Sequence, residues 1–365
     1  MQPTRLGLTQ LFAFCVTLAA SACAAVPPPP PSEIVAQLRD RAVAHGFDGA
    51  ILIGEPDGGE AHFTTDRAIA PDAIWRWASI TKQFAAVLAM QEVAAGKLDL
   101  DAPVARYWPD WRSPSAGHIR IRDLLFHKSG LPQPDASPPD ADGVPGFYRA
   151  AAAASADSAD GYCAGKLRAE APADFDYNNC DTIVLAEILR RITGQDFETL
   201  VRTRFAGPLG MKSFGLFTLD RPAHPHVQPN GDDADVDALL NLGVYGASGG
   251  AYGSIADLWR FDHALLKGDL LPAAVREQMW TSSAENGFLA FFQWTYPAPL
   301  KGCAGPVRIV ERQGLIGGIE LRNYLLPESG RGLILFSRHR PTGLGDPWEG
   351  KGFAFDMLST VACRS

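Results

Sequence analysis

The stretch Trp75-Arg-Trp-Ala-Ser79-Ile-Thr-Lys82-Gln-Phe84 places a serine three residues ahead of a lysine, and an apolar run to Val93 follows. Residues i and i+3 lie on one face of a helix, so the Ser79 hydroxyl and the Lys82 amine are predicted to be neighbours. The start of a helix also carries unpaired N–H groups, which favour a developing oxyanion. Ser79 is therefore a candidate nucleophile, although a serine N-cap followed by an exposed lysine gives the same short pattern.

A second group of polar residues, Phe175-Asp-Tyr177-Asn-Asn179-Cys180, directly precedes a helical pattern over 181–193. A tyrosine hydroxyl whose pKa is lowered by a lysine can relay the proton of a serine. An asparagine amide can hold such a lysine and bind the carbonyl of an amide or ester. The alternative interpretation is a helix cap of the Asx type beside a packed tyrosine.

A third group, Arg312-Gln313-Gly314, lies in a run that predicts a late strand over 307–313. A cation on a strand beside the nucleophile would attract a substrate carboxylate and bias the base toward its deprotonated form. A glycine next to it would let another backbone approach closely. Taken alone, the arginine fits a surface position on a strand better.

Strand patterns occur at both ends of the chain, and helical patterns fill the middle. Alternating apolar residues and hairpin signals predict strands over 49–54, 60–65, 288–296, 307–313, 319–326 and 332–338. Helical periodicity and capping residues predict helices over 32–46, 123–127, 145–156, 181–193, 197–205, 257–266 and 350–361, besides the one that follows Ser79. We therefore expect an α+β fold: an antiparallel sheet from both chain ends, flanked by helices, with a mainly helical insertion over about 100–280.

The three motifs, in this order, resemble those of the serine β-lactamase and penicillin-binding-protein superfamily. The segment Ile121-Arg-Asp-Leu-Leu-Phe-His-Lys-Ser-Gly-Leu-Pro132 is similar to one in the class C branch of that superfamily. Other similar segments are 47–53, 177–211, 249–258 and 325–330. The resemblance covers about residues 45–340, and it implies the α/β sandwich of the β-lactamase/transpeptidase-like fold as one serine hydrolase domain over 32–365.

The resemblance also implies a role for each matching residue. Ser79 would be the acylated nucleophile, and Lys82 its immediate proton acceptor or electrostatic activator. Tyr177 would be the general base and later the general acid, while Asn179 would bind substrate and steady Lys82. The late strand would line the substrate site through Arg312, Gln313 and Gly314. The backbone N–H groups of Ser79 and Leu315 would form the oxyanion hole.

The strand motif departs from the Lys-Thr-Gly of true β-lactamases and from the His-x-Gly common in esterase-like relatives. Arg312 keeps the charge but cannot exchange a proton at working pH, and Gln313 replaces a small hydroxyl and intrudes on the site of a β-lactam carboxylate. We therefore expect an esterase or D-peptidase-like hydrolase rather than an efficient β-lactamase, with a small-molecule ester, D-peptide or β-lactam as substrate and no cofactor. The alternative is a catalytically weak or inactive surface protein that binds a cell-wall peptide or a protein partner.

The N-terminus reads as a targeting segment. Arg5 is followed by an apolar run and by small residues, which predicts a signal peptide over 1–22. The residues before Cys23 resemble a bacterial lipobox, so Cys23 would carry lipid and the proline-rich stretch in 23–31 would be a tether. Ordinary cleavage nearby is the alternative. In both cases we expect an exported, periplasmic protein, in contact with a membrane only through that anchor.

Charge and cysteine content narrow the choices further. The net charge of −8 argues against a nucleic-acid partner, which needs a basic surface. The exported body would hold four cysteines, and an oxidising compartment would favour disulfides among them. Three pairings are possible; proximity favours Cys163 with Cys180 and Cys303 with Cys363, and four buried thiols are the alternative.

Two other patterns suggest competing sites. Gly246-Ala-Ser248-Gly-Gly250 fits the nucleophile elbow of α/β-hydrolases, but a glycine-broken approach and a delayed helix favour a tight loop at the margin of the site. His224-Pro-His226 suggests a metal, yet a third ligand with suitable spacing is missing, so no metal site is expected. The tryptophans at 75, 77, 108 and 111 are expected in the core.

Overall fold

The computed structural model describes residues 31–149, 158–219, 224–230, 233–339 and 343–363. The expected signal peptide, Cys23 and residues 23–30 of the expected tether lie outside these ranges. Pro31, placed at the end of the tether by sequence, is the first residue of helix α1 (Pro31–His45). Within the described residues, no helix is both long enough and apolar enough to cross a membrane.

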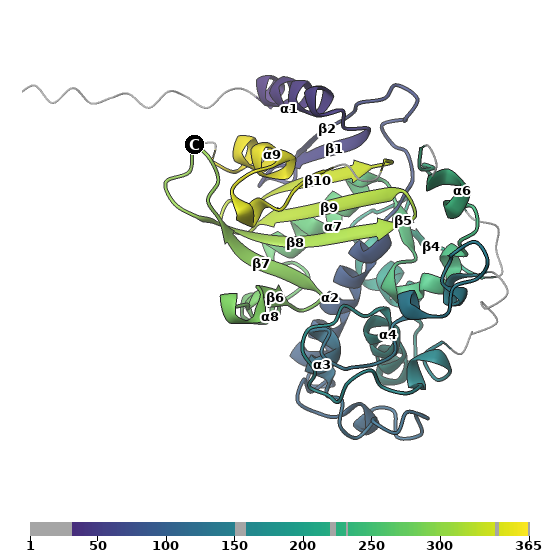
Figure 1. The fold of residues 1–365 in the computed structure, drawn as a ribbon. Helices are drawn as coiled ribbons and strands as arrows, with labels where there is room; N and C mark the ends of the chain where they lie inside the picture. Colours follow the sequence, from purple (N-terminus) through teal and green to yellow (C-terminus); the bar gives the residue numbers. More distant parts are fainter. Residues whose placement is uncertain (1–30, 150–157, 220–223, 231–232, 340–342, 364–365) are drawn as a thin grey trace, which may run out of the picture.

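A seven-stranded antiparallel sheet joins the two ends of the chain, as expected (Figure 1). Its strands lie in the order β2-β1-β10-β9-β8-β7-β6. Their bounds are β1 Gly49–Gly54, β2 Glu60–Thr64, β6 Leu289–Ala290, β7 Gln293–Ala298, β8 Val307–Ile316, β9 Ile319–Leu326 and β10 Arg331–Ser337. The early strand β1 pairs with the late strand β10, with Gly49 opposite Ser337. This pairing confirms the predicted α+β class.

Both faces of the sheet are covered, because alternate side chains of each strand enter two different cores. Ile51 and Ile53 pack with α1 and with α9 (Phe353–Ala362) on one face. Ala50 and Leu52 belong to the larger core on the other face, which includes α2 (Thr81–Ala94) and α7 (Ile255–Lys267). Figure 1 shows α9 and α7 on opposite sides of the sheet. A run of apolar residues in β1 is therefore buried throughout.

The helical region contains α3 (Ile121–Leu125), α4 (Asn179–Thr193), α5 (Phe197–Val201), α6 (Asp233–Asp237) and α8 (Ala273–Trp280). In Figure 1, α3 and α4 lie beside α2 below the sheet, α8 lies beside β6, and α6 lies at the right of the view. A small antiparallel sheet, β3-β5-β4, bridges the two regions through β3 (Trp75–Arg76), β5 (Ala251–Gly253) and β4 (Gly215–Leu216). β3 leads directly into the turn that carries Ser79.

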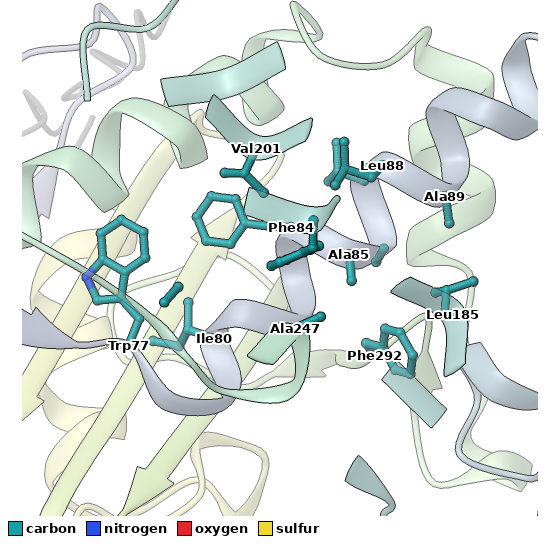
Figure 2. Close-up of a cluster of buried hydrophobic side chains, with 14 of the residues drawn as sticks. Trp77, Ile80, Phe84, Ala85, Leu88, Ala89, Leu185, Val201, Ala247 and Phe292 are labelled. Atoms are coloured by element: carbon teal, nitrogen blue, oxygen red, sulfur yellow. The ribbon is translucent and has the colours of Figure 1, made fainter. Parts of the chain in front are cut away.

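Helix α2 is buried nearly all round, which explains its continuous apolar sequence. The rings of Trp77 and Phe84 stack with centroids 5.5 Å apart, and Phe84 also packs against Phe261 at 4.2 Å. Figure 2 shows this cluster, in which Val201 and Leu185 from other helices approach α2. The four tryptophans expected in the core are all buried. The nucleophile turn is thus attached to a rigid central helix.

Several boundaries differ from the sequence prediction. The strand expected over 288–296 is broken into β6 and β7, with Phe292 between them at a φ of 56°. In the helix expected over 145–156, residues Gly146–Tyr148 form a 3₁₀ turn, and 150–157 lie outside the described residues. Helix α8, of eight residues, was not predicted.

Candidate active site

Ser79 lies in a 3₁₀ turn, Ala78–Ile80, and α2 begins two residues later at Thr81. The sequence had placed Ser79 where the helix begins, which agrees with this position. Ala78 has a φ of 45°, in the left-handed region that a residue with a Cβ rarely adopts. The Thr81 hydroxyl donates a 2.6 Å hydrogen bond to the Ala78 carbonyl and holds this turn closed. The half-buried Ser79 side chain is thereby presented at a cavity.

The Ser79 hydroxyl has two polar neighbours, both of which the sequence singled out. Its Oγ lies 2.6 Å from the Tyr177 hydroxyl and 3.3 Å from Lys82 Nζ. Tyr177 comes from the loop before α4, whereas Lys82 lies in the first turn of α2. The fold therefore brings together the three groups of the proposed acyl-transfer site.

Lys82 is completely buried, yet all three protons of its ammonium group have acceptors. Besides the Ser79 hydroxyl, Nζ donates to Asn179 Oδ1 and to the Ser248 carbonyl, each at 2.6 Å. Burial lowers the pKa of Lys82 to about 8, although the neighbouring Tyr177 acts against this shift. Lys82 is thus a hydrogen-bonded cation at neutral pH.

Two cations act on Tyr177. Burial alone would raise the pKa of this phenol, but the charges of Lys82 and Arg312 outweigh it and bring the pKa below its ordinary value. Lys82 Nζ lies 4.9 Å from the centre of the Tyr177 ring, and Arg312 donates a 2.9 Å hydrogen bond to its hydroxyl. A phenolate at this position is both stabilised and within reach of the Ser79 proton.

Arg312, on β8, is 2 % exposed and fully engaged by the protein. Its Nε donates to the Ser79 carbonyl at 2.8 Å, Nη1 to the Phe292 carbonyl at 2.8 Å, and Nη2 to Tyr177. The sequence led us to expect this cation to face a substrate carboxylate. The structure instead directs each of its nitrogens to a protein oxygen.

Gly314 allows β8 to lie against the nucleophile turn. A Cβ at this position would come within 2.9 Å of the Trp77 carbonyl oxygen and 3.3 Å of the Ala78 Cβ. The close approach places the next residue, Leu315, along the same cavity as Ser79. This placement is compatible with the expected oxyanion hole, in which the backbone N–H groups of Ser79 and Leu315 would point to one oxygen.

The cavity at Ser79 has a volume of about 350 Å³. It is lined by Ser79, Asp135, Tyr177, Trp294, Arg312, Gln313, Gly314, Leu315, Glu320 and Arg322. Every residue that the sequence placed on the substrate side of the late strand is present. Asp135, Trp294, Glu320 and Arg322 were not foreseen.

A family model described as beta-lactamase matches residues 34–347 of the chain, which is most of its length. The chain belongs to the β-lactamase family. The resemblance noted from the sequence motifs is thereby confirmed, and with it the β-lactamase/transpeptidase-like fold.

Several relatives of this β-lactamase-family chain are known. Esterase EstB of Burkholderia gladioli is 29% identical over 271 residues, covering 60% of this chain and 66% of EstB. PbpX of Bacillus subtilis strain 168, described as a penicillin-binding protein, is 26% identical over 208 residues, covering 56% of this chain and 48% of PbpX. The matches thus span about half to two thirds of these relatives.

Solved structures share the fold over nearly the whole chain. A D-stereospecific amidohydrolase from Streptomyces sp. has a TM-score of 0.69 at 23% identity, covering 92% of this chain and 100% of the other. The D-amino acid amidase from Ochrobactrum anthropi SV3 has a TM-score of 0.70 at 21% identity, covering 90% of this chain and 97% of the amidase. At these identities the likeness shows the fold alone.

The family motif around Asn179 is supported by residues that the sequence did not reveal. Asn179 Nδ2 donates to the Tyr148 hydroxyl at 2.7 Å, so the amide is engaged on both sides and only 4 % exposed. Gln133 accepts from the Asn179 N–H at 3.0 Å and donates to the Tyr177 carbonyl at 2.9 Å. The contact of Asn179 with Lys82 is thus present, while the amide is turned away from the cavity.

The nucleophile-elbow interpretation of Ser248 is not supported. Its side chain is 1 % exposed and donates a 2.6 Å hydrogen bond to the Tyr245 carbonyl. It lies at the end of a 3₁₀ segment, Leu242–Ser248, that leads into β5 rather than into a helix. Its contribution to the site is the carbonyl that accepts from Lys82, which agrees with a tight loop at the margin.

The two histidines considered as metal ligands lie apart from Ser79. His226 interacts with Arg76 at 2.8 Å, and its ring packs against Phe217. Among the residues that the structure describes, no three histidine, cysteine or acidic side chains are grouped so as to hold a metal ion.

The four cysteines form two disulfides, Cys163–Cys180 and Cys303–Cys363. This is the pairing favoured by proximity in the sequence. Cys180 is in the first turn of α4, next to Asn179, so the first disulfide ties the loop before α4 to the active site. The second joins the segment before β8 to the end of α9 and lies on the other side of the sheet.

Proposed function

We propose that this protein is a serine hydrolase that forms an acyl-enzyme on Ser79, and that it acts on carboxylic esters or D-amino-acid amides and peptides. The observation that carries the proposal is the 2.6 Å contact between Ser79 Oγ and the Tyr177 hydroxyl, beside the buried cations of Lys82 and Arg312. A nucleophile, a base and its activating charges are thus in contact before substrate binds.

The reaction would proceed in two halves. As Ser79 Oγ attacks the carbonyl carbon, its proton passes to the Tyr177 phenolate, and the carbonyl electrons move to the oxygen at the N–H groups of Ser79 and Leu315. Collapse breaks the bond to the leaving alkoxide or amine, which takes the proton from Tyr177. Water then attacks the acyl-enzyme, gives its proton to Tyr177, and releases the acid as Ser79 regains a proton.

The relatives support this substrate class by the activities in their names: one is an esterase, and two structures are of enzymes that act on D-amino acid amides or D-stereospecific substrates. Within the class we rank short-chain esters first, D-amino-acid peptides second and β-lactams third. Gln313 supports this order, because its amide donates to Glu311 at 2.9 Å, whereas a small hydroxyl at this position would donate to a β-lactam carboxylate.

The test is turnover of an ester, a D-amino acid amide and a penicillin by the wild type, Ser79→Ala and Ser248→Ala. Ser248→Ala is the matched control, since this serine lies near Lys82 but has no access to the cavity. We expect Ser79→Ala to abolish turnover and Ser248→Ala to retain most of it. Undiminished turnover in Ser79→Ala would contradict the proposal, and no turnover in any variant would favour the alternative of a binding protein.

We also propose that the chain is exported and attached to a membrane through lipid on Cys23. The signal-like segment 1–22 supports this, and the two disulfides suit an oxidising compartment. Expression of the full chain in a bacterial host, followed by fractionation, tests it. The wild type should enter the membrane fraction and Cys23→Ser the soluble periplasmic fraction; equal distribution of both would refute the anchor.

A further inference from the structure

The two arginines that line the cavity are both held by protein groups. Arg312 donates to the Ser79 carbonyl, the Phe292 carbonyl and the Tyr177 hydroxyl. Arg322 forms ion pairs with three carboxylates, those of Glu311 at 3.0 Å, Glu320 at 3.3 Å and Asp346 at 3.3 Å. A substrate carboxylate would compete with these contacts for either cation.

Carboxylates also line the cavity from two directions. Asp135 is exposed and comes from the 3₁₀ turn Pro134–Ala136, while Glu320, an ion-pair partner of Arg322, comes from the start of β9. The Asp135 carboxylate accepts hydrogen bonds from three neutral groups of the described chain, those of Tyr148, Gln133 and Asn179. Its charge is therefore not cancelled by a paired cation in these contacts, and it would repel an anionic group bound near Ser79.

Apolar surface makes up much of the remaining wall. Leu315 is 43 % exposed, which is unusual for a leucine on a central strand. Trp294 lies over the Arg312 guanidinium at 5.5 Å and meets the ring of Phe175, itself 41 % exposed, with centroids 6.4 Å apart. Of these, Leu315 and Trp294 line the cavity and would bury an apolar group of a substrate rather than a charged one.

We infer that this active site selects acyl donors that carry an apolar group and no carboxylate, and that Arg312 positions Tyr177 and the Ser79 backbone instead of binding substrate. This inference rests on the proposed acyl-enzyme function and narrows its substrates. Moving Arg312 toward a substrate anion would break hydrogen bonds that hold the nucleophile turn, while Asp135 and Glu320 would oppose the incoming charge.

The direct test compares two esters that differ by one carboxylate: p-nitrophenyl hexanoate and the mono-p-nitrophenyl ester of adipic acid. We expect kcat/KM to be about a hundredfold higher for the hexanoate, because like charges in contact are strongly disfavoured. Equal values, or a preference for the adipate, would overturn the inference while leaving acyl transfer intact. Absence of Ser79-dependent turnover of both esters would overturn the proposed function and, with it, this inference.

Variants of Arg312 separate positioning from carboxylate binding. Arg312→Gln should lower kcat/KM for both esters by the same factor, and it should move the acidic limb of the pH profile to higher pH, because a cation that lowers the pKa of Tyr177 is removed. Arg312→Lys should restore part of the kcat/KM for each ester and move the acidic limb part of the way back to its wild-type pH. A loss confined to the adipate ester would show that Arg312 binds the carboxylate and would refute the inference.

Glu320→Gln is the complementary variant. It removes one negative charge and one ion-pair partner of Arg322 from the cavity wall, and it leaves Ser79, Lys82 and Tyr177 unchanged. We expect the rate on the adipate ester to rise several-fold relative to that on the hexanoate. An unchanged ratio would contradict the role given to this charge. Thermal melting checks that each variant folds. If Arg312→Gln does not fold, the ratio of kcat/KM for the hexanoate to kcat/KM for the adipate ester in the wild type still decides the question.

Discussion

The hydroxyl of Tyr177 lies 2.6 Å from Oγ of Ser79, whereas Nζ of Lys82 lies 3.3 Å from the same atom. The sequence left open whether Lys82 accepts the serine proton or acts through its charge. Because Lys82 already donates to three oxygens, it is held as an ammonium ion and has no lone pair to offer. The geometry therefore favours Tyr177 as the base and Lys82 as its electrostatic activator.

Tyr177→Phe should reduce kcat by about 10²-fold or more, since general-base catalysis is lost while the ring still packs against His127. KM should change little, because the phenol would act on the proton rather than on substrate binding. Steady-state kinetics on a neutral ester measures this. A wild-type rate would remove Tyr177 from the mechanism.

The pKa of Lys82 should set the alkaline limb of the pH profile of kcat/KM. Its pKa is about 8, so raising the pH through this value removes the cation that stabilises the Tyr177 phenolate. We expect kcat/KM to fall above about pH 8, with an apparent pKa that belongs to the coupled pair. In Lys82→Arg, whose cation does not titrate there, the residual activity should lose this limb. A limb unchanged by the substitution would assign it to another group.

The sequence predicted most of the fold because long periodic segments carry strong signals. The strands from both chain ends and the amphipathic helices α4 and α7 lie where capping residues and apolar spacing placed them. The small sheet β3-β5-β4 was missed, since strands of two or three residues have no readable period. The 3₁₀ turn before α2 was also not foreseen, because the strained φ of Ala78 leaves no mark on residue type.

The site was predicted only as far as its motifs extend. Ser79, Lys82, Tyr177 and Asn179 belong to short patterns and are brought together as expected. Gln133 and Tyr148 support them from loops that no pattern identifies, and their role depends on tertiary contacts alone. The orientation of Arg312 was likewise unreadable, because a sequence does not show whether a cation faces the protein or the cavity.

The two disulfides should contribute differently to stability and activity. Their loops span 17 and 60 residues, so loop-closure entropy assigns about 3 kcal/mol to Cys163–Cys180 and about 4 kcal/mol to Cys303–Cys363. Replacing the second pair by alanine should therefore lower the free energy of unfolding more. Replacing the first pair should lower kcat/KM more, because Cys180 adjoins Asn179.

Urea denaturation and ester kinetics on both double variants check this crossed result, with each variant serving as the control for the other. If the two double variants lost kcat/KM to the same extent, the first disulfide would have no specific role in positioning the active site.

Asp262 should make stability depend on pH. This buried carboxyl accepts from Gln83 at 3.2 Å and from Asn323 at 3.1 Å, and burial raises its pKa well above the ordinary value. Folding therefore favours the protonated form of Asp262. The contribution of this carboxyl to the free energy of unfolding is fully present below its unfolded pKa of about 3.9, and it is lost as pH rises through the folded pKa. Asp262→Asn should flatten this slope and raise the free energy of unfolding at pH 8 relative to pH 5.

Chemical denaturation at the two pH values measures the effect on Asp262→Asn and the wild type. If the variant kept the wild-type slope, Asp262 would not be the group that titrates.

Intact-mass spectrometry after brief exposure to an activated ester shows whether an acyl-enzyme forms on Ser79. We expect the wild type to gain the mass of one acyl group, peptide mapping to place it on Ser79, and Ser79→Ala to gain none. Because deacylation depends on Tyr177, the adduct should persist longer in Tyr177→Phe once it has formed. An adduct that formed equally in Ser79→Ala, or ester turnover without any covalent species on Ser79, would contradict the account.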